Sequence, residues 1–556
     1  MMTHARSIDH GAQRGIALAA VPTHPFTSAS PPSDGPGCLT ATSRRRSGPS
    51  DLLRRRSLVT SWRCVCAGML TIAGLVGAPG MAAVWGQTPR PSRPNIVLIV
   101  TDDQGYGDVG CFGAKHLRTP HLDRLAAEGT RFTSFCVAQP VCTASRAALL
   151  TGCYANRISL FGALNHVSNV GIASSEKLLP EICKEQGYAT AIFGKWHLGH
   201  RPVFSPLRHG FDTFLGIPYS NDNGPLHPIV RGIPPLPWID GEQVVETDPD
   251  QSQFTRRLTQ RAIQFVEAHR DQPFFLYLPH IMPHVPIFAS EAFRGRSSAG
   301  LYGDVIEELD QGIGDLVAAI DRLGLAERTW IIFFSDNGPF LSYGNHAGSA
   351  GPLREGKLTT FEGGVRVPCI MRWPGQIPAG RVCSELLSSL DLLPTIAHVI
   401  GGRLGELPID GENHWPLIAG QSGAVGRQTF YYYAGDELHA VRSGSWKLHL
   451  PHEYLTPADP PGRDGKPANF ANLRPESMQL SGLRGIASRH GYLIRKIDLS
   501  LFDLEQDVGE TTNVADQHPQ VVRQLLELAE KAREELGDSL TGRQGRGVRP
   551  CGVWEG

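Results

Sequence analysis

The sequence contains no Cys-x-x-Cys pair, so it lacks the motifs typical of zinc ribbons and thiol-redox centres. It has no excess of charge either, because 53 Lys and Arg residues stand against 54 Asp and Glu, which argues against nucleic acid as a partner. The apolar run over residues 64–76 is too short to cross a bilayer, and no lipid-attachment motif precedes a cysteine. No internal repeat is evident. A chain of 556 residues without these features is expected to fold around a large core and to carry any anion site locally.

Residues 1–92 differ from the rest of the chain and are rich in Pro, Ser and Arg. A basic stretch that ends at Arg63 precedes the apolar run, and small residues follow at 78–83, an order typical of a signal peptide. We expect this signal, around residues 54–86, to direct export to the periplasm or the exterior. The mature chain would start near Gln87 without a stable membrane anchor. The alternative is a disordered or mis-assigned extension upstream of the true translation start.

Continuous apolar and β-branched runs indicate strands that are buried on both faces. These runs cover residues 95–101, 189–193, 274–278 and 330–335. Helical patterns cover residues 119–129, 143–150, 254–269 and 302–323. In the first of these helices Thr119 is expected to act as the N-cap and Pro120 to occupy the first helical position. The alternation predicts an α/β domain over residues 93–427 with a doubly wound, mostly parallel sheet.

Polar residues follow these strands at the points where the strands end. They are Asp102-Asp103, Lys195-Trp196-His197, His280 with His284, and Asp336-Asn337. In doubly wound sheets, ligands bind beyond the carboxyl ends of the strands. The sequence therefore predicts a functional site at this edge of the sheet.

After about residue 427 the pattern changes to short segments. Strand-like pieces cover residues 428–433, 440–442 and 446–450, and a loop-rich stretch and an amphipathic helix at 519–536 follow them. We interpret residues 428–556 as a smaller C-terminal α+β subdomain.

The pentapeptide Cys142-Thr-Ala-Ser-Arg146 places a cysteine at a helix start and an arginine four residues later, on the same side of the first turn. The amino terminus of a helix attracts anions, and a guanidinium adds a charged fork for a tetrahedral oxyanion. A partly buried cysteine beside a surface arginine is the alternative for an isolated pentapeptide.

Seven motifs occur in order along the chain. They are Asp102-Asp-Gln-Gly-Tyr-Gly-Asp108, the Cys142 pentapeptide, Gly194-Lys-Trp-His-Leu-Gly199, Gly216-Ile-Pro-Tyr-Ser220, His284-Val-Pro286, Ser335-Asp-Asn-Gly338 and Gly356-Lys-Leu-Thr-Thr-Phe-Glu-Gly-Gly364. With these motifs the chain resembles the sulfatase family, and most closely the branch of arylsulfatase A and N-acetylgalactosamine-6-sulfatase. The resemblance implies an alkaline-phosphatase-like α/β fold, with a mixed, mostly parallel sheet flanked by helices, and the hydrolysis of sulfate esters.

The resemblance also implies that a formylglycine-generating maturation enzyme oxidises Cys142 to formylglycine, whose hydrated aldehyde presents two hydroxyls. Attack on sulfur would release the alcohol and leave a sulfated enzyme, and the second hydroxyl would then lose its proton and expel sulfate. The chain departs from the family at Ala144, where Pro is usual and Ala occurs in a minority of members. Eight cysteines follow residue 67, so modification of Cys142 leaves an odd number and at least one free thiol.

The resemblance to sulfatases also implies a calcium site. Asp102, Asp103, Asp336 and Asn337 match the family's metal ligands, together with residue 142, and the four side chains offer only oxygen donors, which suit a hard cation. The cation would neutralise a sulfate oxygen and lower the pKa of the hydroxyl at residue 142. The alternative for each residue is a turn-forming Asx residue after a strand.

The remaining site residues take their expected roles from the family. Arg146 would hold the attacking hydroxyl in line with sulfur, and His197 would be the base that collapses the hemiacetal. Lys195 and Ser220 would bind sulfate, and His284 and Lys357 would flank the bridging oxygen and protonate the alcohol. Lys195 and His197 lie two residues apart, so in an extended segment they would point the same way. His280 and Asp222 would line the entrance or shape the loop.

Two other functions fit parts of the sequence. A phosphonate or phosphate monoester hydrolase would share the metal-binding strand ends, and a non-catalytic binder of sulfated glycans would leave Cys142 unmodified. For a sulfatase we expect a sulfated carbohydrate or small molecule as the substrate. Specificity would reside in loops such as 220–238 and 452–495. The sequence leaves the oligomeric state open.

Overall fold

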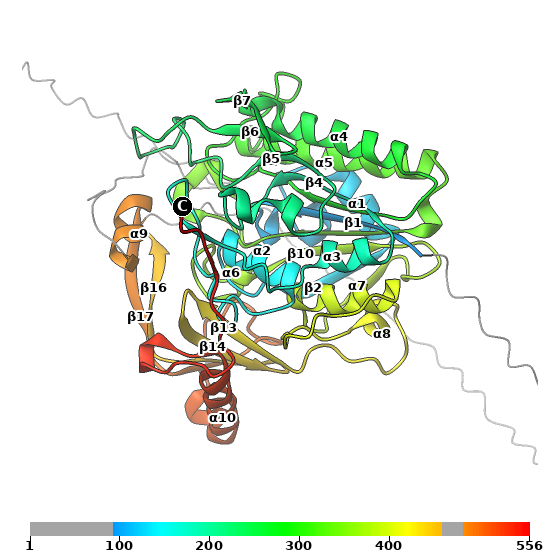
Figure 1. The fold of residues 1–556 in the computed structure, drawn as a ribbon. Coiled ribbons are helices and arrows are strands. Elements are labelled where there is room, and N and C mark those ends of the chain that lie inside the picture. Colours follow the sequence, from blue (N-terminus) through cyan, green and yellow to red (C-terminus); the bar gives the residue numbers. More distant parts are fainter. Residues whose placement is uncertain (1–92, 459–481) are drawn as a thin grey trace, which may run out of the picture. The chain divides into compact units, whose positions relative to one another are not determined.

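A computed structural model describes residues 93–458 and 482–556 of the chain. Its largest element is an 11-stranded mixed sheet (Figure 1). The strands are β1 (Asn95–Thr101), β2 (Thr130–Cys136), β4 (Ala189–Lys195), β5 (Thr213–Ile217), β6 (Pro237–Asp240), β7 (Gln243–Thr247), β8 (Phe274–Pro279), β9 (Thr329–Ser335), β10 (Arg366–Arg372), β11 (Arg381–Cys383) and β12 (Leu387–Ser388). Strands β9, β1, β8, β4 and β5 are adjacent and parallel, whereas β10 and the β6–β7 hairpin run antiparallel to their neighbours. The predicted signal peptide and part of the predicted 452–495 loop lie outside the described residues.

Helices cover both faces of this sheet (Figure 1). Along β1, Ile96, Leu98 and Val100 pack into one hydrophobic cluster, and Val97 and Ile99 pack into another on the opposite face. The first cluster includes α2 (Cys142–Thr151), α3 (Leu179–Glu185) and α7 (Leu392–Ile400), and the second includes α1 (Pro120–Ala127), α4 (Phe254–Ala268) and α5 (Gly300–Arg322). The predicted fold class is confirmed. Within the described part of the chain, no helix has both the length and the apolar character that a membrane span requires.

Helix α1 begins at Pro120 as predicted, but its cap differs. The Thr119 hydroxyl accepts a hydrogen bond from the Gly110 amide (2.8 Å) and donates to the Asp123 carboxylate (3.4 Å), but it does not cap the helix backbone. The first amides of the helix donate instead to the Asp310 carboxylate on α5, at 3.1 Å from His121 and 2.8 Å from Leu122. A tertiary contact therefore satisfies the donors that a capping hydroxyl would otherwise take.

Helix α2 carries the cysteine of the pentapeptide as its first residue. Val141, before it, is extended, with φ of −157°, so the chain turns sharply into the helix at Cys142. Gly152 ends the helix in the left-handed conformation, at φ of 69°, which glycine adopts without steric cost. All eight cysteines of the described residues are free thiols.

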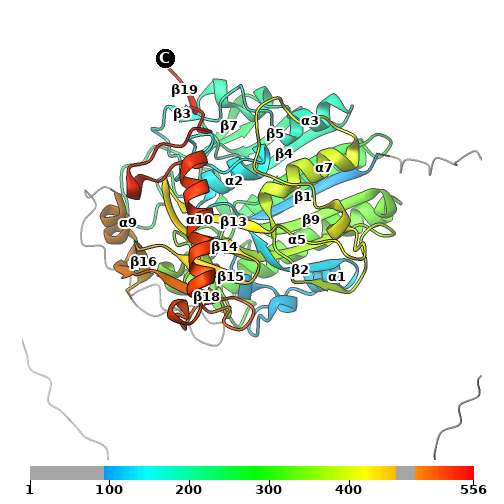
Figure 2. The same cartoon turned by 90° about the horizontal axis from the view of Figure 1, so that it is seen from below.

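The C-terminal region contains an antiparallel sheet of four strands, β13 (Thr429–Ala434), β14 (Glu437–Ser443), β15 (Trp446–His449) and β18 (Ser500–Asp503). Helix α10 (Pro519–Leu536) lies across this sheet (Figure 2) and spans the predicted residues. Strands β16 (His452–Pro457) and β17 (Tyr492–Ile497) pair antiparallel, and α9 (Gly482–His490), which precedes β17, packs against it. The described parts of the predicted 452–495 loop are therefore largely regular secondary structure. The α+β subdomain is confirmed, whereas the boundary at residues 427 and 428 stays a prediction. Phe430, Tyr432 and Leu448 join the core cluster of α2, so the subdomain packs directly on the catalytic region.

The C-terminal tail returns to the catalytic region. Strand β19 (Gly552–Val553) pairs with β3 (Val170–Gly171), and the Trp554 amide donates to the Asn169 carbonyl at 2.8 Å. The guanidinium of Arg201 lies over the Trp554 ring, 4.4 Å from its centroid. The tail thus packs against the segment that follows α2. This segment borders the candidate site.

Candidate active site

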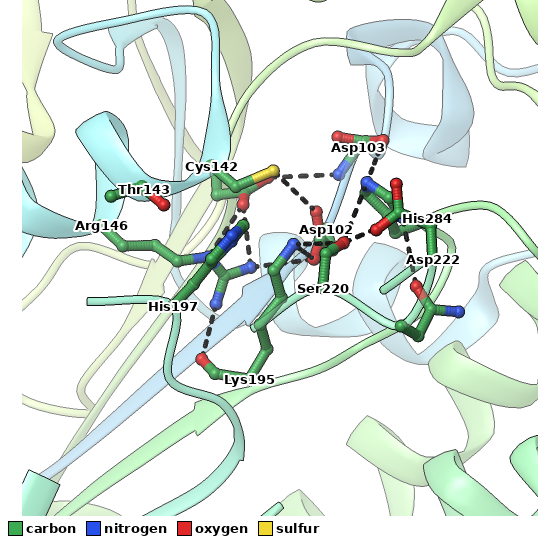
Figure 3. Close-up of polar contacts among 12 residues, drawn as sticks. Asp102, Asp103, Cys142, Thr143, Arg146, Lys195, His197, Ser220, Asp222 and His284 are labelled. Atoms are coloured by element: carbon green, nitrogen blue, oxygen red, sulfur yellow. Dashed lines mark hydrogen bonds and ion pairs between the residues drawn. The ribbon is translucent and has the colours of Figure 1, made fainter. Parts of the chain in front are cut away.

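The side chains predicted at the strand ends converge in one buried cluster (Figure 3). Thr101 and Ser335 are partners in the β1–β9 register, so Asp102 and Asp336, the next residues, emerge side by side. The cysteine at the start of α2 faces the same point. Segments far apart in the sequence therefore meet at the carboxyl edge of the sheet, as predicted.

Asp102 is the shared partner of three other site residues. Its carboxylate lies 2.6 Å from Lys195 Nζ, 3.2 Å from Arg146 Nη2 and 3.6 Å from Cys142 Sγ. Burial alone would raise the pKa of Asp102, but the positive charges of Lys195 and Arg146 hold it well below its usual value. The carboxylate is therefore ionised at neutral pH.

Asp103 faces the opposite side of the cluster and has a left-handed backbone, with φ of 65°. Its carboxylate accepts hydrogen bonds from Lys357 Nζ at 2.7 and 2.9 Å and from Asn337 Nδ2 at 2.7 Å. A left-handed non-glycine residue costs about 1–3 kcal/mol and is common at functional sites. The surrounding contacts hold Asp103 in this conformation.

Arg146 binds carboxylates from two strands. Its guanidinium lies 2.8 Å from Asp336 Oδ2 and 3.2 Å from Asp102 Oδ2, and it donates to the Lys195 carbonyl at 3.0 Å. Its side chain is fully buried. Cys142 and Arg146 thus contact the same Asp102 carboxylate, which agrees with their predicted placement on one side of the first turn.

Cys142 is 1% exposed, and its thiol has a carboxylate and an ammonium group as neighbours. Lys357 Nζ is 3.4 Å from Sγ. Burial raises the pKa of the Cys142 thiol to about 12, although Lys195 and Lys357 oppose that rise. The thiol stays protonated at neutral pH and is a poor nucleophile in this unmodified form.

Ser220 and His284 lie next to Lys195 and Asp103, respectively. Asn221, which lies outside the sequence motifs, orients the His284 imidazole. The Ser220 hydroxyl is 3.1 Å from Lys195 Nζ and 3.2 Å from His284 Nε2. His284 Nδ1 lies 2.6 Å from the Val285 carbonyl and 3.1 Å from Asn221 Oδ1, two acceptors that place the ring proton on Nδ1. His284 Nε2 is 3.6 Å from Asp103 Oδ2. The structure therefore brings the predicted sulfate-binding and metal-binding residues into contact.

The prediction that Lys195 and His197 lie in one extended segment is wrong. Strand β4 ends at Lys195, and His197 has a left-handed backbone, with φ of 60°, so the segment is not extended. His197 Nε2 donates to the Leu164 carbonyl at 2.7 Å, and the buried Nδ1 has no hydrogen-bond partner among the described residues. Burial and the charge of Lys195 lower the pKa of His197 well below its usual value. The ring is therefore neutral and has a proton-accepting nitrogen.

A cavity of about 680 Å³ opens above the cluster and is lined by Cys142, His197, Ser220, His284 and Lys357. Asp222 lines it too, as expected for a residue at the entrance. His280 differs: it is fully buried and is not part of the lining, which leaves for it only the loop-shaping role.

Asp108 also supports the site, although only its place in the first motif pointed to it. The buried carboxylate accepts hydrogen bonds from the Tyr302 hydroxyl at 2.6 Å, the Gly105 amide at 2.7 Å and the Ser349 amide at 2.9 Å. Burial raises the pKa of Asp108 to about 7, although these hydrogen bonds oppose the shift. Its position fixes the turn that follows Asp103.

Comparison with known proteins identifies the family of proteins to which this chain and its site belong. The family model described as Sulfatase matches residues 94–402, and the model described as C-terminal region of aryl-sulfatase matches residues 425–552. The chain belongs to the sulfatase family. The family and branch predicted from the motifs are confirmed, and the protein is a sulfuric ester hydrolase.

Individual sulfatases are similar to this one over most of their length. N-acetylgalactosamine-6-sulfatase of Canis lupus familiaris is 40% identical over 409 residues, which cover 70% of this chain and 76% of that protein. Arylsulfatase A of Bos taurus is 39% identical over 477 residues, or 81% of this chain and 87% of that protein. Among solved structures, the PsFucS1 sulfatase of Pseudoalteromonas sp. matches with a TM-score of 0.67 and 26% identity, over 80% of this chain and 90% of that one.

Proposed function

We propose that this sulfatase hydrolyses sulfate esters of carbohydrates with formylglycine at residue 142 and a bound calcium ion. The observation that carries the proposal is the position of Cys142, which begins a helix at the floor of the cavity with Asp102 3.6 Å and Lys357 3.4 Å from its sulfur. The name of its N-acetylgalactosamine-6-sulfatase relative supports the choice of a carbohydrate. Export by a signal peptide also stays a proposal.

Formylglycine fits the surroundings of residue 142. The aldehyde hydrate supplies a hydroxyl nucleophile toward sulfur, which the buried thiol does not supply because its pKa is raised to about 12. Lys195, which contacts Asp102, and Lys357, which contacts the Cys142 sulfur, would bind the charge that sulfate brings. The maturation enzyme is required as a partner.

The oxygen-rich side of the cluster fits calcium. Asp102, Asp103, Asp336 and Asn337 would hold the ion, because they offer carboxylate and amide oxygens in one place. The Asn337 Oδ1 atom is buried and has no hydrogen-bond partner among the described residues, as suits a ligand atom for a cation. When bound, calcium would supply positive charge at a sulfate oxygen and at the hydroxyl of residue 142.

Proton transfer can be divided between two residues of the chain. Burial lowers the pKa of His284, and its ring proton lies on Nδ1, so Nε2 can accept a hydrogen bond but cannot donate one. Lys357 stays cationic, because Asp103 raises its pKa well above the usual value even though burial opposes this. We assign protonation of the leaving alcohol to Lys357, substrate positioning to His284 and Ser220, and acceptance of the hydroxyl proton to His197 Nδ1.

Mass spectrometry of the tryptic peptide 132–146 tests the modification. This peptide, which ends at Arg146, contains both Cys136 and Cys142. We expect a loss of about 18 Da at residue 142 and an unmodified thiol at Cys136, because only residue 142 lies in the maturation pentapeptide. An intact thiol at residue 142 in an active preparation would contradict the proposal.

Calcium binding should raise the melting temperature of the protein. An ion that binds only the folded state at a concentration of about 100 times its Kd adds about 2.7 kcal/mol to the free energy of unfolding. We expect the shift in Tm between calcium and EGTA to disappear in Asp103→Asn and to persist in Asp240→Asn, a half-buried residue paired with Arg261 at 3.1 Å. Equal shifts in the two variants would exclude a calcium site at Asp103.

Kinetic measurements distinguish the proposed sulfatase from the alternative, a phosphonate or phosphate monoester hydrolase. Nitrophenyl sulfate and nitrophenyl phosphate share their leaving group, so the ratio of their kcat/KM values reports only the preference for sulfur or phosphorus. A strong preference for the phosphate ester would replace the proposed reaction with phosphate monoester hydrolysis.

A further inference from the structure

The cavity extends from Cys142 to the C-terminal subdomain, beyond the residues assigned to sulfate. Its upper walls are largely apolar and include Leu164, Val230, Ile233, Leu358, Leu483 and Ile486. Since the sulfate group is bound at the floor, the leaving alcohol must lie against these walls. Apolar walls favour an alcohol with uncharged, partly apolar surface.

Most of the charged side chains that line the cavity are negative. Four carboxylates line the cavity, on Asp222, Asp436, Glu437 and Glu453, whereas Arg489 is the one guanidinium among the described lining residues. Lys357, the remaining lining cation, is bound to Asp103 at the floor. His439 and His490 add little positive charge, because burial lowers their pKa values to about 3. A leaving group with a second anionic substituent would therefore meet a negative wall.

Glu437 is one of these carboxylates, and a series of contacts leads from it toward the floor of the cavity. It is the first residue of β14, and its carboxylate lies 2.9 Å from His439 Nε2. His439 Nδ1 lies 3.3 Å from the hydroxyl of Thr360, three residues after Lys357. No lysine or arginine of the described residues forms an ion pair with Glu437, whereas Glu453 lies 3.6 Å from Lys496.

We infer that the cavity selects sulfate esters whose leaving alcohol carries no further negative charge, and that Glu437 is the residue that sets this selectivity. The inference rests on the proposed function and narrows its substrate class to alcohols with a single sulfate and otherwise neutral groups. Neutral sugar hydroxyls can donate hydrogen bonds to the wall carboxylates, while a carboxylate or a second sulfate is repelled by them.

A matched pair of substrates tests the selectivity. One is 4-nitrophenyl sulfate, and the other carries an added carboxymethyl group on the same ring. We expect the native enzyme to prefer the neutral ester by roughly ten-fold in kcat/KM at neutral pH, since two like charges several ångströms apart repel by about 1–2 kcal/mol at a partly buried site. In Glu437→Gln, which keeps an acceptor for His439, the preference should fall several-fold, and in Glu437→Lys it should reverse.

The controls separate this inference from the proposed reaction. The preference is the ratio of the kcat/KM values for the two esters, so a change in activity that affects both esters alike leaves it unchanged. Glu242→Gln, which removes one charge outside the cavity lining, should also leave the preference unchanged. The preference of the native enzyme should weaken at high salt. An unchanged ratio in Glu437→Gln with full activity on the neutral ester overturns the inference alone. Failure of the matured native enzyme to hydrolyse either ester overturns the proposed reaction and the inference together.

Discussion

Replacing Cys142 by alanine should reduce kcat on nitrophenyl sulfate by at least about 1,000-fold while the fold is kept. The side chain is the precursor of the proposed nucleophile, and alanine cannot be oxidised to an aldehyde. The structural cost is small, because Sγ makes only long contacts, at 3.4 Å to Lys357 and 3.6 Å to Asp102. We expect the free energy of unfolding to fall by no more than about 1 kcal/mol, measured by chemical denaturation.

Cys183→Ala is the matched control. Cys183 is fully buried in α3 within the hydrophobic core, away from the cavity lining, so the same atoms are removed without touching the reaction. This variant should lose comparable stability and keep its native kcat. Sulfate release by Cys142→Ala at the native rate, from a host that contains the maturation enzyme, would remove residue 142 from the mechanism.

The parallel centre of the sheet was predictable because its strands are buried on both faces. Such strands are continuous apolar runs, as in β1, β8 and β9, and a polar residue at the end of the run marks the catalytic edge. Asp102 and Asp336 could therefore be placed at one edge before their contacts were known. That they are neighbours follows from the β1–β9 register, which the sequence does not encode locally.

The edges of the sheet were not predictable in the same way. Strand β7 is largely exposed, and β11 and β12 have only three and two residues, too few to produce a periodic pattern. Strand β2 alternates between buried and half-buried positions near its start, yet its antiparallel pairing with β10 joins segments more than two hundred residues apart. Contacts at such separation override local propensity.

Within the site, residue identity was predictable but side-chain direction was not. The left-handed backbones at Asp103 and His197 are imposed by tertiary contacts, such as the Leu164 carbonyl that binds His197. Asn221 carries no signal of its own beside Ser220, and its role follows only from the 3.1 Å contact with His284. His280 shows the converse, since a histidine at a strand end proved to be fully buried outside the cavity lining.

Arg146 contributes both to stability and to the reaction. A matched variant of a second buried arginine, Arg157, separates these two effects. Arg157 is also buried and bidentate, at 2.7 and 2.8 Å from the Asp410 carboxylate and 2.8 Å from Glu535, but it lies outside the cavity lining. Loss of one partner from a buried ion pair costs about 3–5 kcal/mol, because the other charge stays buried. Both arginines should therefore show a similar loss of stability when truncated.

Arg146→Ala should lower the free energy of unfolding by about 3–5 kcal/mol and reduce kcat by more than about 100-fold at temperatures where the variant is folded. The buried Asp336 carboxylate loses its partner at 2.8 Å, and the floor of the site loses the charge that orients Asp102. Arg146→Lys should fall between the native enzyme and the alanine variant, because one ammonium cannot make the three contacts of the guanidinium. Arg157→Ala should lose similar stability by chemical denaturation and keep its kcat. If the two alanine variants lost activity in proportion to stability alone, Arg146 would be a structural residue and its assignment to the reaction would be wrong.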